Sequence, residues 1–152
     1  MRLRGLSVFL IVSAVSVWGA ASASADRLTD SEHGGRPLET VLLPGNEVPP
    51  HNTSATGSAL ITVNPGQAEV CWSITFSGLS TPATAAHIHH GPPGVAAPVV
   101  IPTPVPAVAT GTGHGCTTVT SELAHDLAAN PSDYYVNVHD SVFPTGEIRA
   151  QL

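Results

Sequence analysis

The clearest pattern in the chain is an alternation of apolar and polar side chains over residues 68–76. Successive side chains of a β-strand point to opposite faces, so a period of two indicates a strand with one buried face. Such alternation is typical of an antiparallel strand whose other face meets water. The predicted core face holds Val70, Trp72, Ile74 and Phe76, and the opposite face holds Glu69, Cys71, Ser73 and Thr75.

Apolar runs bounded by turn residues predict further short strands. We expect them at residues 39–43, 53–63, 84–89 and 99–101, with a tight turn at 64–67. Prolines at positions 102, 104 and 106 remove backbone donors, so the 99–101 strand is expected at a sheet edge or in an extended loop. Gly111, Gly113 and Gly115 are interpreted as a flexible approach to Cys116.

The residue pattern of the C-terminal third of the chain predicts one helix and one β-hairpin. Residues 120–129 form the helix, with Thr120 or Ser121 as N-cap and Pro131 after its end. Residues 134–139 and 146–152 are expected to pair. The register that keeps apolar residues together places Val138 beside Ile148 and Val136 beside Ala150. On the outer face, the same register places His139 across from Glu147 and Asn137 across from Arg149. About seven short strands and one helix predict an all-β fold, an antiparallel β-sandwich or Greek-key barrel.

Histidines lie on two of these strands. His87 and His89 share one face, opposite Ile88. On the later strand His139 shares a face with Tyr135 and Asn137, opposite Tyr134, Val136 and Val138. If the aliphatic residues face the core, three imidazoles lie on the outer surface, where they converge if the two strands are neighbours.

Several segments also carry a family resemblance. AHIHHGPPGVAAPVV is followed by NPSDYYVNVHDSVFPTGEIRAQL, and LPGNEVPP and FSGL lie upstream. These segments resemble the CHRD domain, a module found in chordin and in many secreted microbial proteins, over residues 38–152. Ala150 departs from the second glycine of the family's usual G-E-I-R-G-Q-L ending, and His90 is inserted after A-H-I-H. The resemblance implies a secreted β-rich module of mostly undefined activity.

Residues 1–25 predict a secretory signal peptide. Arg2 and Arg4 precede an apolar run at 6–17, and Ala23-Ser24-Ala25 gives an A-x-A cleavage site. A membrane anchor fits less well, because a span needs ~20 apolar residues. We therefore expect an exported chain, without a membrane span after cleavage, that begins with a flexible lead-in at residues 26–37.

Charge narrows the possible partners. After cleavage at residue 25 the chain would hold three arginines, no lysine and eleven acidic residues, a net charge of −8. Nucleic-acid binding needs clustered basic residues, so nucleic acid is excluded as a partner. Cations, basic proteins and neutral extracellular ligands remain.

Cys71 and Cys116 both lie in the exported part. Two cysteines in an oxidising compartment favour one disulfide between them. Zinc ligation by thiolates and an intermolecular bridge are the alternatives, and the chain has no C-x-x-C spacing to support the first.

The three histidines are candidate metal ligands. His87, His89 and His139 are the minimum set for a copper or zinc site with one open position. H-x-H with a third histidine on a later strand also resembles the copper-binding arrangement of copper-zinc superoxide dismutase, although the other histidines and the arginine of that site have no counterparts. Asn137 and Glu147 are candidate second-shell partners that orient an imidazole.

Each of these candidate site residues also has a purely structural interpretation. The histidines can instead hydrogen-bond across strands or to backbone, and Glu147, Arg149 and Asn137 can form a surface network. His90 is a poorer ligand candidate, and His114 can swing toward the site from its glycine-rich segment. The remaining histidines, expected at the surface, are His33, His51 and His125.

No catalytic motif is present. The chain lacks a G-x-S-x-G elbow, a glycine-rich phosphate loop and an H-E-x-x-H helix, and its carboxylates suggest no glycosidase pair. The sequence thus favours a secreted, non-catalytic binding or structural module of undefined ligand. The alternative is a copper or zinc protein with a redox or metal-scavenging role.

Overall fold

The computed structural model describes residues 34–152. The expected signal peptide, most of the lead-in and His33 lie outside the described residues. Between residues 34 and 152, no helix is both long and apolar enough to cross a membrane.

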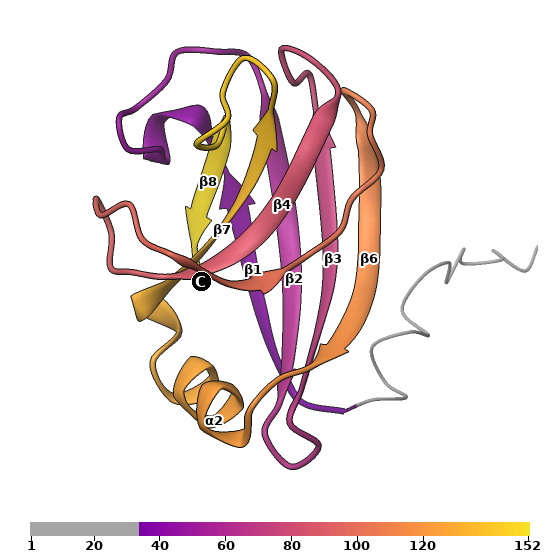
Figure 1. Ribbon diagram of the computed structural model, residues 1–152, viewed down its shortest axis with the longest axis vertical. Coiled ribbons are helices and arrows are strands. Elements are labelled where there is room, and N and C mark those ends of the chain that lie inside the picture. Colours follow the sequence, from indigo (N-terminus) through magenta and orange to yellow (C-terminus); the bar gives the residue numbers. More distant parts are fainter. Residues whose placement is uncertain (1–33) are drawn as a thin grey trace, which may run out of the picture.

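Two four-stranded antiparallel sheets pack face to face (Figure 1). The first sheet has the order β1 (Arg36–Leu42), β2 (Thr56–Asn64), β3 (Glu69–Ser77) and β6 (Gly111–Thr118). The second has the order β5 (Val99–Pro102), β4 (Ala83–His90), β7 (Tyr134–Asp140) and β8 (Ile148–Gln151). The predicted antiparallel sandwich is confirmed.

Within residues 34–152, three helical segments connect the strands. Two are short 3-10 turns, η1 (Pro44–Asn46) and η2 (Pro131–Asp133). The third is α2 (Ser121–Ala129), whose N-cap Thr120 accepts a hydrogen bond from the Leu123 N–H. This is the helix expected at residues 120–129, and it buries Ala124 and Leu127.

The core lies between the inner faces of the sheets. The predicted inner face of β3 is buried, from Val70 to Phe76 at every second position. Ile88 of β4 and Val136 and Val138 of β7 meet it from the second sheet. In the closing hairpin Val138 pairs with Ile148, Val136 with Ala150 and Asn137 with Arg149, as the apolar pattern predicts.

A disulfide links the two strands at one edge of the first sheet. Cys71 of β3 pairs directly with Cys116 of β6, and their sulfurs are bonded. The predicted disulfide is therefore present. It closes a loop that contains β4 and β5.

The glycines before Cys116 form a strand instead of a flexible segment, so that interpretation is wrong. Gly111, Gly113 and Gly115 occupy alternate positions of β6. A side chain at Gly113 would meet Val105 at 2.6 Å, and one at Gly115 would meet the Trp72 ring at 2.7 Å. Their spacing reflects close approach of the β5–β6 connection and of Trp72 to this strand.

We predict that Gly113→Ala destabilises the fold by ~1–3 kcal/mol, because the new methyl group overlaps the Val105 backbone. Urea denaturation measures the change. Gly45→Ala is the matched control, since nothing lies within 4 Å of the added carbon, and its stability should match that of the wild type. Equal stability of the two variants would contradict the close packing at β6.

Candidate metal centre

The outer face of the second sheet is a polar layer buried under loops. The sequence predicted an exposed face here, which is wrong. His89 is 6 % exposed, His139 7 %, Asn137 1 % and Arg149 2 %. Three loops, at residues 43–51, 91–98 and 140–147, supply hydrogen-bond partners or close contacts to this layer. Only His87 among the three histidines is half-buried.

Neighbouring strands bring the three histidines together. β4 and β7 are antiparallel partners, with His87 opposite Asn137, His89 opposite Tyr135 and His139 opposite Ala85. One nitrogen from each of His87, His89 and His139 lies within 4.8 Å of the others. The His87 Nδ1 and His139 Nε2 atoms are 2.9 Å apart.

A backbone carbonyl fixes the proton of His139. Its Nδ1 lies 3.1 Å from Pro144 O. A carbonyl only accepts, so His139 Nδ1 carries the proton and Nε2 presents its lone pair. The His87 Nδ1–H then donates to His139 Nε2. Two nitrogens at this separation subtend about 90° at an ion ~2.0–2.1 Å from each.

His89 lies between a carbonyl and an amide. Its Nδ1 is 2.8 Å from Ala97 O, and its Nε2 is 3.0 Å from the Asn137 side chain. Asn137 Nδ2 donates to Thr145 O, which turns Asn137 Oδ1 toward His89, so both neighbours of the ring accept hydrogen bonds. A neutral His89 has one proton for these two acceptors, and the shorter contact to the Ala97 carbonyl favours the Nδ1–H form, in which Nε2 faces Asn137 Oδ1.

Burial favours the neutral form of all three imidazoles. Desolvation lowers the pKa of His139 to about 4, helped by the neighbouring His87. Desolvation also lowers the pKa of His87, as does the proximity of His89. The pKa of His89 is lowered by burial, against hydrogen bonds that oppose the shift. Neutral imidazole is the form that binds metal ions.

The other candidates lie elsewhere. Glu147 accepts hydrogen bonds from the N–H and hydroxyl of Ser80. His90 is exposed and stacks on Tyr134. His114 lies on β6 in the opposite sheet, so it cannot swing into the group.

Of the remaining histidines, His125 is exposed as expected, but His51 packs against Phe143 and its Nε2 is buried. The expected surface network of Arg149 is replaced by buried contacts to Val95 O and Pro92 O.

Sequence reasoning missed Glu47, which follows η1. The residue is 4 % exposed, and its Oε1 is a buried oxygen without a hydrogen-bond partner among the described residues. Burial raises its pKa to about 7, although Arg149 opposes the shift. Gly146 has a φ of +126°, and a side chain there would collide with Glu47 Oε1 and Asn137. The position thus requires glycine. Glu47 lies in a proline-rich loop without periodicity, so the pattern gave no indication of it.

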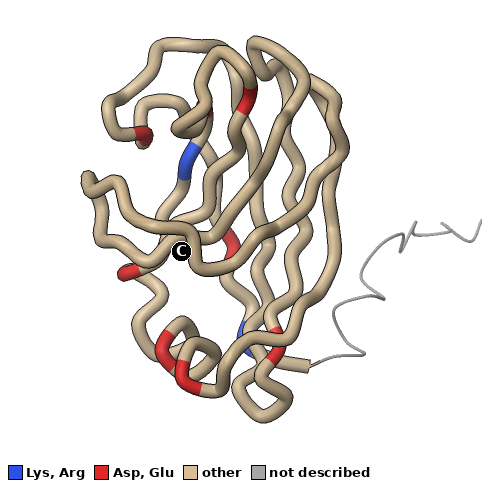
Figure 2. Tube along the Cα trace, in the orientation of Figure 1, with Lys and Arg blue, Asp and Glu red and all other residues tan. Residues whose placement is uncertain are grey.

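Tyr135, on the face that the sequence predicted to be exposed, is buried. It stacks on His89 with centroids 4.5 Å apart, and the Arg149 guanidinium lies 3.3 Å from its centroid. The charges of residues 34–152 are otherwise dispersed, and their basic residues are Arg36 and Arg149 (Figure 2).

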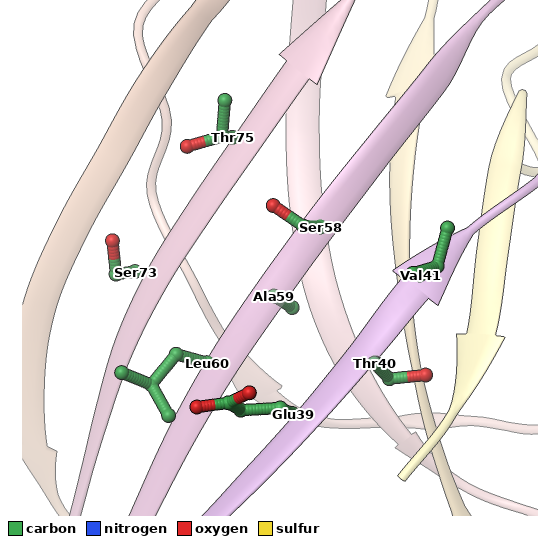
Figure 3. Close-up of a pocket in the computed structure, with 8 residues that line it drawn as sticks. All are labelled: Glu39, Thr40, Val41, Ser58, Ala59, Leu60, Ser73 and Thr75. Carbon is green, nitrogen blue, oxygen red and sulfur yellow. The ribbon is translucent and has the colours of Figure 1, made fainter.

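The first sheet carries a hollow of about 440 Å³ on its outer face. Figure 3 shows it across β1, β2 and β3, lined by hydroxyls of Ser58, Ser73 and Thr75 with Glu39 at one side. It contains no group of converging ligand atoms, so the histidine group is the better candidate site.

Comparison with known families supports the resemblance. The family model of the CHRD domain matches residues 38–152, and the chain therefore belongs to the CHRD domain family. No curated protein and no solved structure matched the chain. Membership is consistent with a non-catalytic binding or structural module.

We predict that Glu47→Gln stabilises the protein at pH 8 but changes little at pH 5. Folding raises the pKa of Glu47 from 4.5 to about 7, so its contribution to stability is present below pH 4.5 and is lost as pH rises through 7. The full loss is about 3 kcal/mol. Glutamine mimics the protonated acid and escapes this loss.

Urea denaturation of both proteins at the two pH values measures the effect. Glu39→Gln, at an exposed position of β1, controls for removing a negative charge. If the free energy of unfolding differed between Glu47→Gln and the wild type by the same amount at pH 5 and pH 8, the raised pKa of Glu47 would be contradicted.

Proposed function

We propose that this chain is an exported, non-catalytic module that binds one copper or zinc ion through His87, His89 and His139. The observation that carries the proposal is the orientation of the rings. The carbonyls of Ala97 and Pro144 accept hydrogen bonds from the Nδ1–H groups of His89 and His139, which leaves the Nε2 atoms of both rings unprotonated. Carbonyl partners of this kind orient histidine ligands in metal sites.

His87 completes the set by a tautomer change. In the structure its Nδ1 proton lies between two nitrogens, where a cation would lie. Moving that proton to Nε2 gives His87 a free Nδ1 lone pair without changing its charge. Because His87 is half-buried, this side of the group is the more open to solvent. An open position suits metal scavenging or a redox role.

Export is supported by three features: the signal-peptide pattern at residues 1–25, the Cys71–Cys116 disulfide and membership of the CHRD family. Disulfides persist in oxidising compartments. Asn137 contacts His89 Nε2, the proposed ligand atom, so its amide would turn away from a bound ion, and Glu147 has its hydrogen bonds with Ser80 instead.

A structural role for the histidines is the second candidate. It is favoured by one observation: the ring nitrogens of His89 and His139 and the Nδ1 of His87 already have partners within the protein. On this interpretation the group satisfies buried polar atoms and any ligand binds elsewhere.

Calorimetric titration of the chelator-treated protein with copper and with zinc distinguishes the two. We predict that one equivalent binds and that His139→Ala lowers the affinity by more than the ~10–100-fold that loss of a residue orienting a ligand costs, because it removes a ligand itself. His125→Ala, an exposed histidine of α2, should bind like the wild type.

Equal affinity of wild type and His139→Ala, or millimolar binding in both, would instead establish the structural role. In that case His139→Ala should still lower the stability of the metal-free protein, since the partners of its ring would be left unpaired.

A further inference from the structure

The loop at residues 91–98, called the strap below, lies over the polar layer and is attached to it by backbone carbonyls. Gln151 Nε2 donates to Gly91 O at 2.8 Å. Arg149 donates to Pro92 O through Nη2 and to Val95 O through Nη1. Ala97 O faces His89 Nδ1. The strap therefore connects Arg149 to His89 through a few residues of backbone.

Arg149 also reaches His89 through a stack of rings. Its guanidinium lies 3.3 Å from the centroid of Tyr135. Tyr135 is parallel to His89, with 3° between the ring planes and 4.5 Å between centroids. The Tyr135 hydroxyl accepts from Ala97 N at 3.1 Å, so the stack and the strap meet at Ala97.

Arg149 is suited to this double role by its shape. A planar guanidinium can stack on an aromatic face while its N–H groups donate within the same plane. The ammonium of lysine has the charge but neither the plane nor the fork. Arg149 is almost fully buried, so its contacts are not exchanged with water.

We infer that Arg149 is a positioning residue for His89: by holding the strap and Tyr135 it keeps the Ala97 carbonyl at Nδ1, which holds the proton of His89 there and leaves Nε2 unprotonated for a ligand. Two acceptors compete for this proton, and without the Ala97 carbonyl in place it moves to Nε2, which then donates to Asn137 Oδ1, 3.0 Å away. In that arrangement His89 cannot ligate. The metal-related part of this inference rests on the proposed function.

The test compares Arg149→Lys with the wild type, both labelled with ¹⁵N-histidine. In the metal-free proteins, ¹⁵N NMR reports which ring nitrogen carries the proton. We expect the Nδ1–H form of His89 in the wild type and a mixture with the Nε2–H form in Arg149→Lys. His139 should keep its Nδ1–H form in both, because Pro144 O does not depend on Arg149. A general loss of structure would change both histidines.

Copper titration of the same proteins is the second readout. Arg149→Lys should lower the affinity ~10–100-fold, as loss of a residue that holds a metal ligand in position does. Arg36→Lys is the control. Arg36 lies on β1 in the other sheet and donates to Ala128 O, so this change should leave both readouts as in the wild type. If the wild type binds neither copper nor zinc, the proposed function fails, and the NMR result still decides the role of Arg149.

Tyr135→Phe is the variant to use if Arg149→Lys has a much lower melting temperature than the wild type. It removes the hydroxyl that contacts Ala97 and leaves the ring in the stack. A partial shift of His89 toward the Nε2–H form is expected. An unchanged Nδ1–H form of His89 in every folded variant would overturn the inference.

Discussion

The burial of a polar layer on the outer face of the second sheet is the constraint on which the rest of this structure depends. A buried donor or acceptor without a partner costs about 1–3 kcal/mol, so each side chain there requires a specific partner. The loops supply these partners as backbone carbonyls, among them Ala97 O for His89 and Pro144 O for His139. The same hydrogen bonds that hold the loops in place therefore also fix the proton positions of the imidazoles.

The edge of this layer is organised in the same way. Asp140 and Glu147 are fully buried and accept hydrogen bonds from Thr81 and Ser80, in the connection before β4. Asp140 additionally accepts from the Phe143 N–H, which shapes the turn that presents Pro144 O to His139. Carboxylates, imidazoles and a guanidinium thus share one arrangement, in which a buried side chain holds a covering loop. This explains why every residue of β7 is buried although only half of them face the core.

Period-two alternation identified the parts of the fold that depend on burial of one face. It placed His87 with His89 and His139 with Asn137, and matching of apolar residues gave the register of β7 and β8. The alternation could not show that the outer face of the second sheet is also buried, because the covering loops have no periodicity. Their contacts also use main-chain oxygens, which are present in every residue and leave no mark on the sequence. The glycines of β6 were misread for a related reason. Their spacing is set by Trp72 and Val105, which are distant in sequence.

The two interpretations of the histidine group share almost all of its structure and differ at one position. Fixed Nδ1 protons on His89 and His139 serve a structural group and a metal centre equally well. The difference lies between His87 Nδ1 and His139 Nε2, where either a proton or a metal ion can be held. A proton there makes one neutral hydrogen bond, worth about 0.5–1.5 kcal/mol. An ion replaces it with bonds to several lone pairs. Because burial keeps the three rings neutral, the exchange requires a change of tautomer at His87, the ring most open to water, and a turn of the Asn137 amide away from His89 Nε2.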